Sequence, residues 1–488
     1  MFSKEVPLSQ KYAIFTGMKP EYILFLMFSY FALLLIVAKA STKRGDNATF
    51  FVGNRQSPWW LVSFGMIGAS LSGVTFISVP GWVESSGMAY MQMVLGYVVG
   101  YFCIAFILLP IYYRYNTTTI YGFLFKRYGE IAHKTGATFF ILSRWLGASF
   151  RLYLVAAILQ SLVFDQLGVG FIWTVIITLA LIWIYTNRGG IRTVIFTDTL
   201  QTLAMLGAVC LTIFYVYQSL DNSDGILNTI FSQEESKWFF PDATDGRNFW
   251  KQFLGGVFIT MAMTGLDQDM MQKNLTCRNL REAQLNMITL SGVLVFVNIL
   301  FLSLGVLLLV YARQEGIDAH GDQLFPAVAN YYDIPLIVGL LFFIGLIAAA
   351  YSSADSALTS LTTSFCVDIL SVEKMKESRG LLIRKRVHIG MTLAIALLII
   401  IARPFVDASI IKNIFTAAGY TYGPLLGLFA FGILSKSSIQ NKIVIPVAAL
   451  LSPILTYVIS WISPIYWNYT FGFEIILLNG LLMTTMLY

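Results

Sequence analysis

The chain is 488 residues long, and 57% of its residues are hydrophobic while only 12% are charged. Soluble domains carry about 25% charged residues, so the composition excludes a soluble globular protein and predicts an integral membrane protein. The net charge of +6 does not indicate nucleic-acid binding, because no Lys/Arg cluster is interleaved with solvent-facing aromatic residues. The four cysteines stand singly without CxxC spacing, which argues against a disulfide framework or a zinc site.

Long apolar runs between short polar breaks predict thirteen transmembrane helices, since about 20 apolar residues cross a bilayer as a helix. The predicted spans are residues 21–40, 58–80, 88–113, 135–163, 168–186, 194–218, 248–272, 285–312, 333–369, 387–402, 408–434, 442–462 and 466–487. These runs are too long and continuous for a transmembrane barrel, whose strands alternate over about ten residues. We expect an all-α membrane protein in which residues 1–488 form one transmembrane domain.

The basic residues predict the orientation, because cytoplasmic loops carry an excess of Lys and Arg. With the N-terminus outside, most of the 32 Lys and Arg residues fall at cytoplasmic ends, and Lys273 is counted among them. Only Arg144 and Arg151 fall inside a span. The prediction is an external N-terminus and a cytoplasmic C-terminus, in a plasma membrane or a bacterial inner membrane.

Glycines beside polar residues predict breaks within two of the spans. In the second span these residues are Gly65, Gly68, Ser70, Ser72, Gly73 and Thr75, and in the seventh they lie between Gly255 and Asp269. The two spans lie five apart, so the second copy would cross the membrane in the opposite sense, as an inverted repeat requires. Paired interruptions of this kind point to a transporter binding site, although either segment alone could simply allow close helix packing.

The ninth span carries a polar face. Ser352, Asp355, Ser356 and Thr359 follow helical spacing and share one side of the helix. An acid at mid-span is costly and by default indicates a functional site; a buried Asp bonded within the bundle is the alternative. Hydroxyl, carboxylate and carbonyl oxygens suit a hard cation, for which sodium is the obvious candidate. Asp198 in the sixth span is either part of such a site or a first-turn acid that stabilises the helix dipole.

Three motifs, in this order, resemble those of the sodium:solute symporter family. They are residues 188–201 (RGGIRTVIFTDTLQ), residues 265–273 (GLDQDMMQK) with 282–284, and residues 352–356 (SSADS) with 368–369. The resemblance extends from about residue 21 onward. It implies a LeuT-like fold in which residues 58–218 and 248–434 form two inverted five-helix repeats, with peripheral helices at 21–40 and within 442–487. It also implies a symporter rather than an enzyme, and no GxSxG or HExxH motif is present.

The resemblance implies positions for one or two coupling sodium ions. The first sodium would bind the carbonyl groups of Gly68, Leu71 and Ala349 and the hydroxyl groups of Ser352 and Ser353. The second would bind Asp198, Asp355 and Ser356. Asp355 stands where the family has a hydroxyl group, which leaves open whether a second sodium binds.

The predicted substrate site favours neither glucose nor a related sugar. At Thr75, Val94, Met263 and Thr264 the sugar-binding pattern of the family is absent. Arg144 and Arg151 lie on one face of their helix, and Arg is a bidentate partner for carboxylates, which favours an organic anion. The alternative is that these arginines pair with a buried acid such as Asp355 or with lipid headgroups. The predicted substrate-binding residues are Ser70, Ser72, Thr75, Arg144, Arg151, Met263 and Thr264.

The sequence therefore predicts a sodium-coupled symporter that imports a small polar solute, with an organic anion favoured, by alternating access. A carrier of a neutral sugar, polyol or amino acid is the alternative, followed by a channel or membrane sensor. The expected partners are the solute, sodium ions and the lipid bilayer, with no nucleic acid and no obligatory protein partner.

Overall fold

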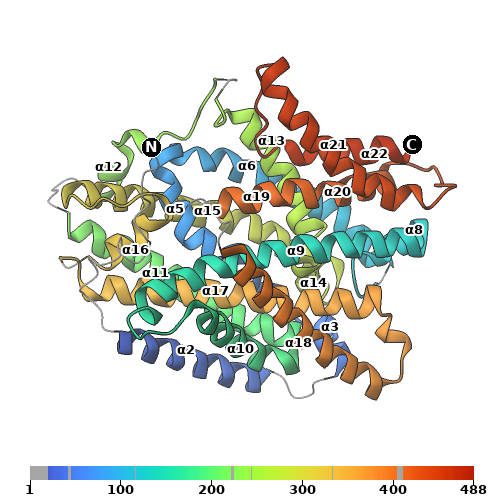
Figure 1. The fold of residues 1–488 in the computed structure, drawn as a ribbon, viewed down its shortest axis with the longest axis horizontal. Coiled ribbons are helices and arrows are strands. Elements are labelled where there is room, and N and C mark those ends of the chain that lie inside the picture. Colours follow the sequence, from blue (N-terminus) through green and yellow to red (C-terminus); the bar gives the residue numbers. More distant parts are fainter. Residues whose placement is uncertain are drawn as a thin grey trace.

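Helices make up nearly all of the chain that the structure describes. The computed structural model describes residues 20–41, 46–115, 117–220, 225–242, 245–331, 333–403 and 410–488. Within these ranges there is no strand, only an isolated bridge between Ser57 and Cys277. Most long helices run along one direction of the molecule (Figure 1). The first residues of the predicted span 408–434 lie outside the described ranges.

The helices follow the predicted spans closely. In the N-terminal part of the chain they are α2 (Pro20–Ser41), α3 (Asn47–Val52), η1 (Gly53–Arg55), α4 (Trp59–Ser70), α5 (Gly73–Ser86), η2 (Gly87–Ala89), α6 (Tyr90–Cys103), η3 (Ile104–Leu108), α7 (Leu109–Tyr115), α8 (Gly122–Tyr128), α9 (Glu130–Leu159), η4 (Gln160–Phe164), α10 (Phe171–Gly189) and α11 (Ile191–Gln218). In the C-terminal part they are α12 (Ile226–Phe231), η5 (Glu234–Ser236), α13 (Phe249–Thr260), η6 (Met261–Gly265), α14 (Gln268–Asn274), α15 (Leu280–Gln314), η7 (Gly321–Gln323), α16 (Leu324–Ala329), α17 (Leu336–Ser364), η8 (Phe365–Ile369), η9 (Val372–Lys374), α18 (Glu377–Ala402), α19 (Ile410–Thr421), α20 (Gly423–Leu434), α21 (Val444–Tyr466) and α22 (Ile475–Leu487).

The number of membrane crossings stays a prediction. In the described residues, eight helical stretches are each long and apolar enough to cross a bilayer. The pair Ile414–Thr421 and Gly423–Leu434, bent by 41°, makes a ninth. The predicted last span, 466–487, is helical only from Ile475, because Glu474 accepts hydrogen bonds from the Tyr469 hydroxyl and the Gly472 amide and holds that segment in a loop.

The predicted break in the second span is confirmed. Helix α4 ends at Ser70 and α5 begins at Gly73, so Leu71 and Ser72 lie between two helices, and Ser72 has extended backbone angles. Gly68 lies so close to α11 that a Cβ atom there would stand 2.2 Å from Thr202 Oγ1. Glycine is therefore required for α4 to approach α11 just before the break.

The predicted break in the seventh span is also confirmed. Helix α13 passes into the π-helical turn η6, and the chain leaves helical geometry before α14. Asp267 is extended there and caps α14 by accepting hydrogen bonds from the amides of Asp269 (2.7 Å) and Met270 (3.3 Å). All seven residues of α14 are buried, so its polar side chains must find partners inside the protein.

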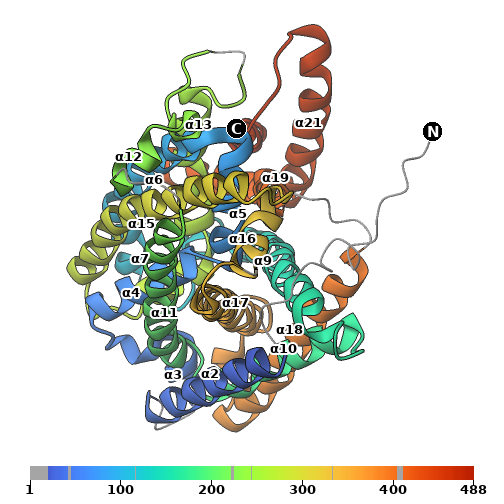
Figure 2. The ribbon, with the colours of Figure 1, turned by 90° about the vertical axis from the view of Figure 1, so that its left-hand side faces the viewer.

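Helix α17 lies at the centre of the molecule. Seen end-on in Figure 2, it is surrounded by other helices, and α4, α5, α9, α10, α11 and α18 all contact it. Every residue from Gly345 to Ser364 is buried. The predicted polar face of the ninth span therefore points at neighbouring helices rather than at lipid, which places its oxygens where a site can form.

Candidate functional site

One cavity collects all seven residues predicted to bind substrate. The break between α4 and α5 contributes Ser70, Ser72 and Thr75, helix α9 contributes both arginines, and η6 contributes Met263 and Thr264. The cavity has a volume of about 120 Å³, which is room for about four water molecules at about 30 Å³ each. The two helix breaks and α9 thus converge on a space large enough for a small organic solute.

The cavity also has polar residues that the sequence did not single out. Tyr90, Tyr97, Tyr101 and Asn298 line it, and the Tyr90 and Tyr97 hydroxyl oxygens are 3.0 Å apart. They lie within apolar helices, where a lone Tyr or Asn carries no signal of its own. No Asp or Glu is among the described residues that line the cavity.

The two arginines of α9 differ in their partners. Arg144 is buried, forms an ion pair with Asp269 and lies 3.8 Å from an oxygen of Asp267. The Tyr422 hydroxyl also donates to Asp267. Pairing with a buried acid, the alternative weighed for these arginines, therefore holds for Arg144, although the acids are Asp267 and Asp269 and not Asp355.

Arg151 lines the same cavity without such a partner. Among the described residues its guanidinium forms no ion pair and no hydrogen bond, and only part of the residue is exposed. A buried or half-buried cation without a counter-charge is unfavourable. The arrangement therefore offers a positive group to whatever enters the cavity.

The residues predicted to bind the first sodium lie on two neighbouring segments, the α4–α5 break and the middle of α17. A Cβ on Gly68 would lie 3.4 Å from Ser352 Oγ, and one on Gly73 would lie 3.9 Å from the Ala350 amide nitrogen, so the break runs along α17 at Ala349–Ser353. The Ser353 hydroxyl is buried and has no partner among the described residues. An unpaired buried hydroxyl is costly, and a cation bound here would remove that cost. The donor set of hydroxyl and carbonyl oxygens fits sodium.

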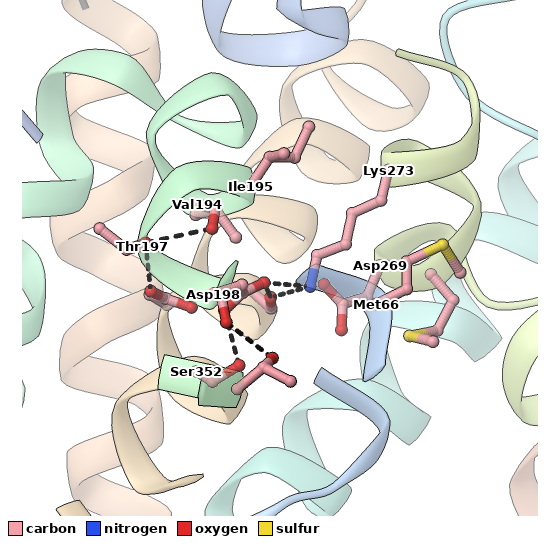
Figure 3. Close-up of polar contacts among 12 residues, drawn as sticks. Met66, Val194, Ile195, Thr197, Asp198, Asp269, Lys273 and Ser352 are labelled. Carbon is pink, nitrogen blue, oxygen red and sulfur yellow. Dashed lines mark hydrogen bonds and ion pairs between the residues drawn. The ribbon is translucent and has the colours of Figure 1, made fainter. Parts of the chain in front are cut away.

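Two of the three residues predicted for a second sodium contact a lysine. The Lys273 ammonium donates to Asp198 Oδ2 (2.6 Å) and to Ser356 Oγ (2.6 Å), and Ser352 Oγ donates to Asp198 Oδ1 (2.6 Å). Figure 3 shows Lys273 reaching from α14 toward Asp198 on α11, with Ser352 at the same carboxylate. Asp355 makes separate contacts, with Oδ2 accepting from Tyr185 at 2.8 Å.

Lys273 corrects one assumption made from the sequence. The sequence places it at the cytoplasmic end of a span, among residues expected to face water, but its side chain is fully buried and ion-paired. One feature of the sequence could have indicated that Lys273 is buried. It ends the GLDQDMMQK motif, four residues after Asp269, and directly follows a predicted helix break. Hydropathy alone could not separate a short buried helix from a loop.

Comparison with known proteins identifies the family of the chain. The family model of the sodium:solute symporter family matches residues 50–441. The chain belongs to this family. Among relatives of the symporter, the sodium/sialic acid symporter NanT of Aliivibrio fischeri is 25% identical over 457 residues, covering 88% of this chain and 86% of that protein. The human sodium/iodide cotransporter is 24% identical over 447 residues, which cover 86% of this chain and 67% of the cotransporter.

A solved structure confirms the fold of the symporter. It is described as the substrate-bound outward-open state of a Na+-coupled sialic acid symporter with a novel Na+ site, and it matches 95% of this chain and 96% of its own at a TM-score of 0.79 and 21% identity. The LeuT-like, all-helical fold is thus confirmed. The chain is a multi-pass, sodium-coupled secondary transporter of a small solute and not an enzyme.

Proposed function

We propose that the solute carried with sodium is a small organic anion that binds through a carboxylate. The observation that carries this proposal is the unpaired guanidinium of Arg151 in a cavity whose described lining residues include no acid. A guanidinium binds a carboxylate through two parallel hydrogen bonds, so a carboxylate solute would supply both the missing charge and the missing acceptors.

The remaining cavity residues suit a polar solute. Hydroxyl groups of Ser72, Thr75 and Thr264 and the amide of Asn298 can bind hydroxyl or amide groups of the solute. Sugar acids combine these groups with a carboxylate, and two of the relatives are named as sialic acid symporters. N-acetylneuraminate is therefore the first solute to test, with a short monocarboxylate as the second.

Uptake into proteoliposomes tests the proposal. Sodium-driven uptake of labelled N-acetylneuraminate, or of lactate, is expected to be competed by the free acid but not by its methyl ester, which lacks the carboxylate charge. Competition by ester and acid alike, or uptake of neutral sugars and amino acids only, would reject the anion and favour a neutral solute.

We propose that one sodium ion binds at the carbonyl groups of Gly68, Leu71 and Ala349 and the hydroxyl groups of Ser352 and Ser353. The unpaired Ser353 hydroxyl and the closeness of Gly68 to Ser352 support this site. Its ligands come from the α4–α5 break and from α17, and the same break lines the solute cavity through Ser72 and Thr75. Sodium would therefore stabilise the form of the break that binds solute.

Alternating access requires that the cavity be closed on one side at a time. We propose that Arg144, Asp267, Asp269 and Tyr422 close the side toward α14. These residues join α9 to the η6–α14 break and to the junction of α19 and α20. Opening this side would separate the ion pair.

We further propose that residues 58–218 and 248–434 are inverted repeats and that the N-terminus is external. The excess of Lys and Arg at the opposite ends of the spans supports the external N-terminus. Contacts between loops expected on one side support the order of the crossings: Met88 N donates to the Lys237 carbonyl, and Glu84 pairs with His320. Loops expected on the opposite side also contact each other. Ser57 N donates to the Thr276 carbonyl, and the Thr118 hydroxyl donates to the Glu373 carboxylate.

A further inference from the structure

A side chain of the protein itself lies at the second cation position. The Lys273 ammonium contacts Asp198 and Ser356, two of the three residues expected to bind a second sodium, at 2.6 Å each (Figure 3). We propose that Lys273 takes the place of the second sodium, so that the symporter binds one sodium ion per cycle. The inference rests on the proposed function only in taking the first sodium site as given.

The Asp198 carboxylate has no acceptor position left for a metal ion. An ionised carboxylate offers about four lone-pair sites. Oδ2 faces Lys273 at 2.6 Å and the Ser356 hydroxyl at 3.4 Å, and Oδ1 accepts from Ser352 at 2.6 Å. With its amide oriented to suit its neighbours, Gln201 donates to Oδ1 at 3.1 Å. Four donors therefore satisfy this carboxylate without sodium.

Lys273 alone balances the charge of the Asp198 carboxylate. Lys273 and Asp198 are both fully buried and neutralise each other as an ion pair. The other nearby acid, Asp355, directs Oδ2 to the hydroxyl groups of Tyr185 (2.8 Å) and Thr197 (3.4 Å). A sodium ion added beside Asp198 would meet a like charge at close range, which is unfavourable in a buried site.

The backbone around Lys273 is fixed. The Thr276 hydroxyl donates to the Lys273 carbonyl at 2.6 Å. The neighbouring Gln272 side chain donates to the Phe51 carbonyl (2.7 Å) and to the Thr363 hydroxyl (2.9 Å). Because α14 is held from both sides, the ammonium is a tethered cation and not the end of a loose loop.

The ion pair also orients a ligand of the first sodium. Ser352 gives its hydroxyl proton to Asp198, so the two lone pairs on its oxygen remain free to face a cation. Lys273 thus acts as a positioning residue for the first site, through Asp198 and Ser352.

The number of sodium ions bound per protein tests the inference without a transported solute. Saturation binding of ²²Na+ to the purified full chain is expected to give one site in the wild type. Lys273→Met keeps the side-chain length but frees Asp198 and Ser356, so it should give two sites. Adding Asp198→Asn should return the count to one. Lys134→Met removes an exposed lysine paired with Glu130; it is the matched control and should leave the count at one.

The sodium counts can overturn the inference that Lys273 replaces the second sodium. Two sodium ions bound by the wild type would overturn the inference, and so would a count of one in both Lys273→Met and Lys273→Ala, the second of which leaves more room. The wild-type count needs no variant, so it decides even where a variant misfolds. Failure of carboxylate transport with one sodium bound would reject the proposed solute and leave this inference standing. A wild type that binds no sodium would reject the first sodium site and this inference with it.

Discussion

At the scale of single residues, Ser353 offers the cleanest test of the first sodium site. Its hydroxyl has no other partner among the described residues, so Ser353→Ala removes a proposed ligand and little else. We expect the sodium concentration for half-maximal uptake to rise about tenfold, since a hydrogen-bond-like contact to a charge is worth about 1.5–3 kcal/mol. Measuring solute uptake over a range of sodium concentrations gives this value for the variant and the wild type.

The matched control is Ser360→Ala. Ser360 is also buried on α17, but its hydroxyl donates to the Ala357 carbonyl of the same helix at 3.1 Å. This variant should keep wild-type sodium activation. Equal sodium activation in Ser353→Ala and the control would remove Ser353 from the site.

The two arginines of α9 should respond differently to the same substitution. Lys keeps the charge but loses the planar fork, so Arg151→Lys is expected to weaken carboxylate affinity about 10- to 100-fold. Sodium binding should change little. Arg144→Lys disturbs the pair with Asp269 instead and should mainly lower thermal stability. Isothermal titration with the carboxylate solute, beside sodium-induced thermal stabilisation, separates the two effects. Normal carboxylate affinity in Arg151→Lys would contradict the anion proposal.

At the scale of helices, the break between α4 and α5 depends on Gly68. A Cβ there would stand 2.2 Å from Thr202 Oγ1, and that oxygen is held by hydrogen bonds to the carbonyl groups of Phe64 and Asp198. Gly68→Ala should therefore cost about 1–3 kcal/mol of stability and weaken sodium activation, as thermal unfolding and uptake would show.

Two further variants make this prediction specific. Gly207, on α11, has no atom within 4 Å of a built Cβ, so Gly207→Ala should be nearly neutral. Thr202→Ala removes the clashing oxygen and should partly rescue Gly68→Ala. Lack of rescue would mean that the clash is not what makes Gly68 necessary.

The contact between α5 and η7 should depend on pH. Hydrogen bonds and charge from Glu84 (2.5 Å) and Asp318 (3.0 Å) raise the pKa of His320 above its ordinary value. Because the folded-state pKa is the higher one, the stabilisation is complete below the pKa of the unfolded state, about 6.5. It is lost as the pH rises through the folded-state pKa. The contact should therefore loosen in mildly alkaline medium.

Hydrogen exchange of residues 315–323, corrected for intrinsic rates, measures this effect. Protection should fall from pH 6 to pH 8 in the wild type and stay constant in His320→Gln. The same pH response in both proteins would show that His320 is not the titrating group.

Local features of the helices could be predicted from the sequence, whereas contacts between distant helices could not. The two helix breaks and the polar face of α17 could be predicted, because glycine, hydroxyl groups and helical spacing act within a few residues. The partners of Arg144 and Lys273 could not, because Asp269 lies 125 positions from the former and Asp198 lies 75 positions from the latter. Only helix packing brings such residues together.

At the scale of the whole molecule, the orientation in the membrane is open to direct test. Single cysteines at exposed Ser232 and Ser437 would mark opposite sides, in a background without Cys103 and Cys210. A membrane-impermeant thiol reagent should label Ser232→Cys in intact cells. It should label Ser437→Cys only after permeabilisation. The reverse pattern would place the N-terminus inside.

A cation that cannot leave the protein changes the energy available for uptake. With Lys273 at the second cation position, one sodium ion travels with one carboxylate, and no net charge crosses the bilayer. A membrane potential, worth about 2.3 kcal/mol per charge at 100 mV, would then add nothing to uptake. The sodium concentration gradient alone would limit accumulation, so that a tenfold gradient, about 1.4 kcal/mol, concentrates the solute tenfold at most. The buried Lys273–Asp198 pair would thus make this symporter electroneutral, and its uptake would continue unchanged in a depolarised cell.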